Sequence, residues 1–197
     1  SPLFLRRLKK DILKFLPPKT YTIIPIELSV EEAREYKKIE KGIIDETEES
    51  DEKMTHLARI QKLKQFTSKL NAERAVEFIQ SIIDGDEKVV VFTQFLSTAA
   101  FLHETFKSCA VLFTGQKSAT EKQQAIDLFR NTEECKVFVG TIGAAGVGIT
   151  LTEASTLIFI DQPWVPADRE QAEDRIHRAS QTADKVQIIR LIAQGTI

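Results

Sequence analysis

Cysteine and histidine are scarce in this sequence, with two and three of them respectively among 197 residues. Cys109 and Cys135 stand in apolar surroundings, and neither has the spacing to a second ligand that zinc sites show. We therefore expect no metal site on this chain, and we expect the two thiols to act as small core side chains. Unpaired thiols favour a reducing compartment, the cytoplasm or the nucleus.

Long apolar runs and a surplus of one charge are also missing. No stretch approaches the roughly 18 apolar residues of a membrane-spanning helix, and no signal peptide is recognisable. The formal net charge is −2, so no global basic field indicates a nucleic-acid partner. We predict a protein that does not contact a membrane and that would bind DNA only through a local patch.

The phosphate-binding loop of P-loop enzymes is absent as well. The sequence contains no Gly-x-x-x-x-Gly-Lys-Ser/Thr, and the nearest string, GQKS at 115–118, lacks the first glycine and its spacing. No Asp-Glu pair follows a strand-like run in a position to hold Mg²⁺ for such a loop. These absences disfavour a self-contained nucleotide enzyme.

Two kinds of pattern divide the chain near residue 85. Residues 1–84 form a helical lead-in segment, with an acidic loop at 45–52, an extended run at 21–28, and helical patterns at 3–16, from 29 to about 44, at 54–69 and at 72–84. From 85 to 197, helical patterns at 97–107, 118–130 and 167–179 alternate with apolar runs at 88–93, 110–113, 136–140, 157–161 and 185–193. This alternation predicts an α/β domain with a parallel sheet flanked by helices. Both ends look cut, so we expect a piece of a longer chain.

Three notable stretches follow predicted strands, where open parallel sheets collect their ligands. They are TQF at 93–95, TIGAAGVGIT at 141–150 and DQPWVP at 161–166. The small residues of the second stretch allow backbone N–H groups to approach phosphates, but tight helix–sheet packing needs small residues too. Trp164, the only tryptophan, could be a buried anchor or an exposed contact.

The stretch QAEDRIHRASQ at 171–181 is the most informative one. On a helix, Gln171, Arg175 and Arg178 would share one face. Two guanidiniums and an amide suit an anion such as a transferring phosphoryl group, although a solvated helix with ordinary charge pairs would show the same spacing. Arginines without a triphosphate loop suggest one half of a two-lobed nucleotide hydrolase.

These stretches resemble the motifs of the Swi/Snf-type ATPases, a branch of the superfamily-two helicases. Residues 171–181 resemble the sixth motif, and 89–95, 141–150 and 161–166 resemble motif four, motif five and the tryptophan-containing motif after it. The strings LRR at 5–7 and LPPK at 16–19 look like the entry to that family's second RecA-like lobe, and GTI at 195–197 like the point where it continues into a brace helix. The similarity covers essentially the whole chain.

On the nucleotide side, the resemblance implies ATP as the cofactor, with Mg²⁺ and the phosphate cradle on the N-terminal RecA-like lobe of the same protein. Arg178 and Arg175 would be arginine fingers, with Gln171 beside them. Gly146 and Gly148 would face the nucleotide cleft. The lobe alone would hydrolyse no ATP.

On the DNA side, the resemblance implies a translocase on double-stranded DNA. Thr141 would touch a DNA phosphate, Gln94 and Phe95 would lie near the DNA-facing surface, and Trp164 would couple lobe closure to DNA movement.

Several positions depart from the family pattern. Ser180 stands where the family usually has glycine, and Gly143 stands where a basic residue is frequent. Thr150, together with QAEDR, resembles the annealing-helicase (HepA-related) branch, so we expect forked or branched DNA ahead of a nucleosome. The competing hypothesis is a degenerate helicase-fold interaction module without catalysis, against which the intact arginines at 175 and 178 argue.

Overall fold

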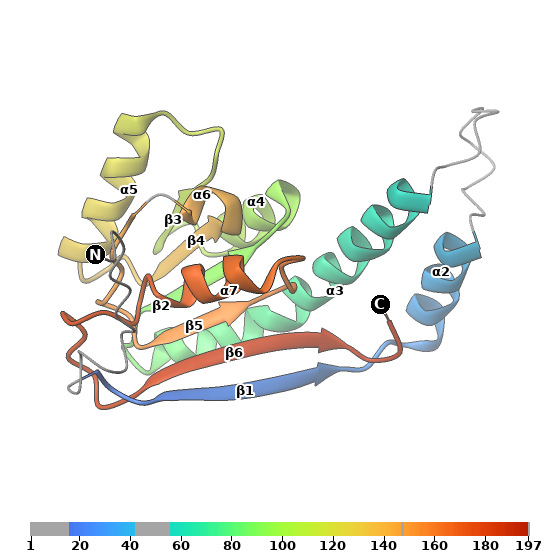
Figure 1. Ribbon diagram of the computed structural model, residues 1–197, viewed down its shortest axis with the longest axis horizontal. Helices are drawn as coiled ribbons and strands as arrows, with labels where there is room; N and C mark the ends of the chain where they lie inside the picture. Colours follow the sequence, from blue (N-terminus) through green and yellow to red (C-terminus); the bar gives the residue numbers. More distant parts are fainter. Residues whose placement is uncertain (1–15, 42–55, 147, 197) are drawn as a thin grey trace, which may run out of the picture.

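The computed structural model describes residues 16–41, 56–146 and 148–196 (Figure 1). Several sequence-based expectations lie outside these residues: most of the helix at 3–16 with its LRR string, the acidic loop at 45–52, and Ile197.

The described residues form a three-layer α/β structure around one sheet of six parallel strands. The strand order is β1-β6-β5-β2-β4-β3. The strands are β1 (Lys19–Ile26), β2 (Val89–Thr93), β3 (Ala110–Phe113), β4 (Val137–Thr141), β5 (Thr156–Phe159) and β6 (Val186–Ala193). Every residue of β2, β4 and β5 is buried, as expected for parallel strands covered on both faces. The predicted fold class is confirmed.

Alternate strand residues enter two separate cores. One contains Val90 and Phe92 with apolar side chains of α5, α6 and α7. The other contains Val89 and Val91 with side chains of α3 and α4. The helices are α2 (Val30–Lys41), α3 (His56–Asp84), α4 (Leu96–Thr105), α5 (Ala119–Asn131), α6 (Ile142–Ala145) and α7 (Pro166–Glu173). Among the described residues, no helix combines the length and apolar content that a membrane span requires.

Helix starts were easier to predict than helix ends. At the start of α2, Ser29 N–H donates to Glu32 Oε2 (2.8 Å) and Glu32 N–H donates to Ser29 Oγ (3.2 Å), which is the capping box expected there. Ser118 and Glu121 form the second box at the start of α5. Both helices therefore begin where the sequence indicated.

The two helices predicted at 54–69 and 72–84 are one continuous helix, α3. No glycine or proline interrupts the chain between them, so nothing breaks the backbone hydrogen bonds there. Leu70 and Ala72 at the expected break are buried, and Ala72 packs in the core with β2 and β4 residues. The division into two helices was wrong.

The helix predicted at 167–179 was also wrong in its second half, because α7 ends at Glu173. The Asp174 N–H still donates four residues back, to Glu170 O (3.0 Å), but the N–H groups of Arg175 and Ile176 donate three residues back, to Ala172 O (3.0 Å) and Glu173 O (3.2 Å). The Arg175 carbonyl then accepts from Leu151 N–H (2.8 Å), on a different segment. A long-range backbone bond therefore replaces the helical one, and the arginines lie on turns.

The segment before residue 85 contributes to the same sheet and core. β1 pairs in parallel with β6 along its whole length, and Ala72, Ala75 and Ile79 of α3 pack against the sheet. The division into a lead-in segment and a domain at residue 85 remains a prediction, but β1 and α3 belong structurally with the strands that follow (Figure 1).

Candidate functional site

The glutamine and the two arginines of the stretch at 171–181 come together although they do not share a helix. Gln171 lies on α7, and Arg175 and Arg178 lie on the turns after it. All three line an open pocket of about 620 Å³, together with Thr150, Asp174, Ala179 and Ser180. The three residues lie together as predicted, but the single helix that was predicted to carry them is not present.

Arg175 is the buried member of this pocket, at 5% exposure. Its Nη2 donates to Gly146 O (3.1 Å), and Gln171 Nε2 donates to the same carbonyl (3.3 Å). Its buried Nε has no hydrogen-bond partner among the described residues. Burial, followed by the charge of Arg178, lowers the pKa of Arg175, while Asp174 acts in the opposite direction. Arg175 lines the open pocket, so its guanidinium is suited to receive an anion there.

Arg178 is held by two bonds at the edge of the same pocket. Its Nε donates to Asp174 O (3.1 Å), and its Nη1 donates to Thr150 Oγ1 (2.6 Å). Both arginines are thus fixed by neutral acceptors, and neither forms a described ion pair with a carboxylate. Their positive charge therefore remains available for an incoming ligand.

Part of the small-residue stretch at 141–150 has the packing role that the sequence left open. Ala144 and Ala145 of α6 are buried in the core. A Cβ added at Gly146 would lie 3.3 Å from the Gly143 carbonyl oxygen, a tight contact at the residue whose own carbonyl accepts two bonds. At Gly148, by contrast, no described atom lies within 4 Å of an added Cβ, so packing does not explain that glycine.

Two of the three strand-end stretches meet at Asp161, and the third lies beside them in the sheet. This carboxylate, 5% exposed, accepts from Thr93 Oγ1, from Gln94 N–H (2.9 Å) and from Ser68 Oγ of α3 (2.7 Å). Thr93 in turn faces Thr141 in the register of β2 and β4. Sequence reasoning missed the role of Asp161, although a carboxylate ending an apolar run is a usable signal.

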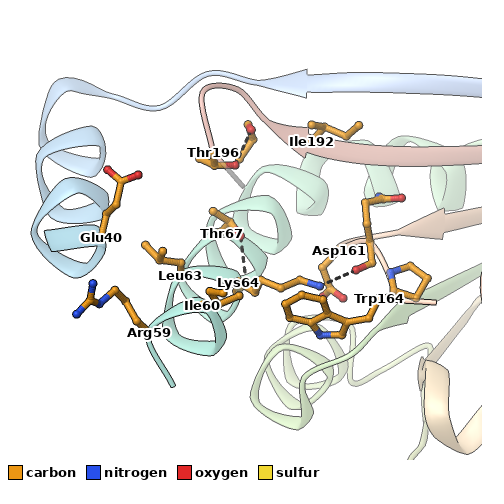
Figure 2. A pocket seen from close by; sticks show the side chains of 13 residues that line it. Glu40, Arg59, Ile60, Leu63, Lys64, Thr67, Asp161, Trp164, Ile192 and Thr196 are labelled. Carbon is orange, nitrogen blue, oxygen red and sulfur yellow. Dashed lines mark hydrogen bonds between the residues drawn. The ribbon is translucent and has the colours of Figure 1, made fainter. Parts of the chain in front are cut away.

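The residues predicted for the DNA side differ in exposure. Phe95 and Thr141 are buried, at 9% and 7%, whereas Gln94 is half-buried and its Nε2 donates to Gln162 O (2.6 Å). Trp164 is 56% exposed. Its ring carries the Lys64 ammonium at 3.7 Å from the ring centroid (Figure 2). The exposed interpretation of Trp164 is therefore the one the fold supports.

A cluster around Glu173, which the sequence did not predict, ties β1 to the arginine-bearing turns. Glu173 is 3% exposed; it accepts from Lys19 Nζ (2.9 Å) and Tyr21 Oη (3.0 Å), and Arg169 Nε lies 3.7 Å away. Four residues later, His177 Nε2 contacts Pro17 O (2.8 Å). Burial, and then the charge of Glu173, raises the pKa of Tyr21. The carboxylate thus holds the segment before Arg175 against the sheet.

Comparisons with known proteins identify the family of this chain. The helicase conserved C-terminal domain family matches residues 73–180, and the SNF2-related domain family matches residues 1–75. An uncharacterized ATP-dependent helicase of Mycoplasma genitalium is 34% identical over 100% of this chain. The human DNA annealing helicase and endonuclease ZRANB3 is 32% identical, also over 100% of the chain.

Among solved structures, the Sulfolobus solfataricus SWI2/SNF2 ATPase core in complex with dsDNA superimposes with a TM-score of 0.72 at 30% identity. The match covers 99% of this chain and 46% of that one. The chain spans about a fifth of the length of the two curated relatives, 21% and 19%. The sequence matches and the fold together show that the chain belongs to the helicase conserved C-terminal domain family, as the second RecA-like lobe of a Swi/Snf-type superfamily-two helicase.

Proposed function

We propose that this lobe is half of a motor that moves along double-stranded DNA at the expense of ATP. The observation that carries the proposal is the pocket where Gln171, Arg175 and Arg178 meet, on a chain without its own triphosphate loop. Electropositive groups of this kind stabilise the charge of a transferring phosphoryl group. A relative described as a DNA annealing helicase and a structural neighbour described as bound to dsDNA support the choice of DNA.

In the proposed mechanism, the N-terminal lobe binds ATP and Mg²⁺, and this lobe closes on the phosphates. Arg178 and Arg175 reach the γ-phosphate as arginine fingers, and Gln171 orients Arg175 through the carbonyl of Gly146 that they share. The open backbone at Gly148 faces the nucleotide cleft. The arginines act only in the closed state, so the lobe by itself hydrolyses no ATP.

The DNA contacts are proposed for the carboxyl edge of the sheet. Thr141 and the backbone beside it would touch a DNA phosphate there, and Gln94 and Phe95 would lie near the DNA-facing surface. Because the side chains of Thr141 and Phe95 are buried, Gln94 and the backbone would be the exposed groups. Trp164, which is exposed, would couple closure to DNA movement. Such contacts to the backbone carry little sequence information. We propose forked or branched duplex as the substrate ahead of nucleosomes, and the cytoplasm or nucleus as the compartment.

The alternative, a non-catalytic interaction module, rested on Ser180 in place of glycine. Among the described residues, Asp86 is the only non-glycine with a positive φ, so Ser180 has a backbone conformation that any residue adopts. Its Oγ lies 2.9 Å from Thr152 Oγ1, which anchors the turn after Arg178. This geometry favours a working arginine pocket.

The test is the ATPase rate of the parent protein with and without duplex or forked DNA. We expect strong stimulation by DNA in the parent and no hydrolysis by the 197-residue chain. A parent with a sound upstream phosphate loop that hydrolyses no ATP under either condition would leave the interaction module as the better account.

A further inference from the structure

One face of α3 contacts the segment that comes directly after β5. Lys64, Ser68 and Asn71 are spaced so that they share a face of that helix. Each donates to the next residue of the segment 160–164, which we call the Trp164 loop. In order, the bonds join Asn71 Nδ2 to Ile160 O (2.8 Å), Ser68 Oγ to Asp161 Oδ2 (2.7 Å) and Lys64 Nζ to Gln162 O (3.0 Å). The helix therefore fixes this segment residue by residue.

Lys64 is the last member of this series and the one that reaches the tryptophan. Its ammonium bonds Gln162 O and lies 3.7 Å from the centroid of the Trp164 ring (Figure 2). The same carbonyl also accepts from Gln94 Nε2 (2.6 Å), so the backbone at residue 162 joins α3 to the end of β2. Burial lowers the pKa of Lys64, and Asp161 opposes that effect. Lys64 is half-buried where it makes these contacts.

The indole is only partly covered by packing. Trp164 is 56% exposed, and it forms one wall of a cavity of about 700 Å³ whose other apolar walls include Ile60, Leu63 and Ile192 (Figure 2). A ring beside such a space is free to rotate unless a specific contact holds it. A cation over an aromatic face is directional enough to do so.

We propose that Lys64 is a positioning residue that holds Trp164 and its loop against α3, so that Trp164 moves together with α3 when this lobe moves. The inference rests on the proposed function, in which Trp164 couples closure to DNA movement. It adds a residue outside the stretches that resemble helicase motifs. Lys64 touches neither the arginine pocket nor the glycines at 146 and 148, so its effect is on coupling and not on hydrolysis.

The first arm of the test measures the tryptophan itself. Trp164 is the only tryptophan of the 197-residue chain, so its time-resolved fluorescence anisotropy reports the freedom of this one ring. Lys64→Met keeps the unbranched stem and removes the charge and the donors. We expect a larger fast component in that variant, restoration in Lys64→Arg, and no change in Lys107→Met, a solvent-exposed lysine paired with Glu104. Circular dichroism confirms that each variant is folded.

The second arm measures coupling in the parent protein. Lys64→Met should leave ATP hydrolysis without DNA unchanged and lower the base pairs translocated per ATP by about two- to thirtyfold, the range of coupling effects from residues that touch neither ligand. Lys64→Arg should recover most of the loss. Unchanged anisotropy in Lys64→Met overturns the inference whatever the motor does.

Freer anisotropy with unchanged coupling overturns the role of Lys64 in the motor and leaves only its contact with the ring. If the wild-type parent does not translocate, the proposed function fails, and the role of Lys64 in coupling fails with it. The anisotropy arm then shows separately whether Lys64 holds the ring.

Discussion

Arg178 illustrates why a guanidinium and not an ammonium is needed in the pocket. Its planar fork has five N–H donors in fixed directions, and two bonds, to Asp174 O and Thr150 Oγ1, already fix its orientation. Donors remain for a ligand without any reorientation of the side chain. A lysine would have to give up these anchoring contacts in order to reach the same anion.

We therefore predict that Arg178→Ala in the parent protein lowers DNA-stimulated ATP hydrolysis by about 10³-fold or more, the usual effect of losing an arginine finger. ATP binding, measured by equilibrium titration, should remain nearly intact, because the phosphate cradle lies on the other lobe. Arg178→Lys should recover little. Arg130→Ala removes an exposed arginine paired with Glu153 and serves as the matched control. Unchanged turnover in Arg178→Ala would remove the proposed mechanism.

At the residue scale, the sequence indicated groups with a distinctive local pattern and missed those defined by long-range contact. The spacing of Gln171, Arg175 and Arg178 was enough to bring them together, even though α7 ends before the arginines. The Glu173 carboxylate carries no such signal, since its partner Lys19 lies 154 residues away. Only the pairing of β1 with β6 brings them together.

Element boundaries show the same division between local and distant causes. Capping boxes are local, so the starts of α2 and α5 were predictable. The end of α7 was not, because the bond that replaces its next helical turn comes from Leu151 N–H. The continuity of α3 was missed. Ser68 and Asn71, at or beside the expected break, are buried and bond the sheet edge, contacts that no local pattern indicates.

The contact between β1 and α7 can be tested through Tyr21, whose hydroxyl donates to Glu173 (3.0 Å). Tyr21 is 58% exposed and Glu173 keeps its bond from Lys19. Tyr21→Phe should therefore lower the free energy of unfolding by about 0.5–1.5 kcal/mol, measured by urea denaturation of the chain. Ile23→Val, at an exposed position of the same strand, is the control and should change stability little.

We also predict that the stability difference between wild type and Tyr21→Phe depends on pH. The pKa of Tyr21 is raised above 10.0, first by burial and then by Glu173. Because the folded state binds this proton more tightly, the stabilisation is fully present below pH 10 and is lost as the pH rises through the raised value. The stability difference between wild type and Tyr21→Phe should therefore shrink above pH 10. A difference that stays constant from pH 8 to pH 11 would contradict the assigned bond.

At the scale of the whole molecule, the arginine pocket and the DNA-side residues occupy one chain whose net charge is only −2. A lobe without a global positive field cannot hold a polyanion by long-range attraction. In the proposed function, its contacts with DNA would come from a few groups at the carboxyl edge of the sheet, such as Gln94 and the backbone beside Thr141, and the N-terminal lobe would supply the rest. We therefore expect strong DNA binding only when both lobes of the parent protein are present and closed.

The salt dependence of duplex binding tests how the DNA contacts are divided between the two lobes. Each phosphate that a Lys or Arg neutralises contributes about −0.9 to the slope of log Kobs against log[salt], whereas neutral side chains such as Gln94 and Thr141 contribute none. We therefore expect a shallow slope for the 197-residue chain, no steeper than about −2 to −3. The parent protein should bind more tightly and with a steeper slope, because both lobes then contribute. Fluorescence anisotropy with a labelled duplex measures both, and a duplex of scrambled sequence should give the same slopes, since phosphates carry no sequence information. A slope beyond about −6 for the chain alone would require many phosphate contacts on this lobe. That result would contradict the expectation that DNA affinity depends on both lobes.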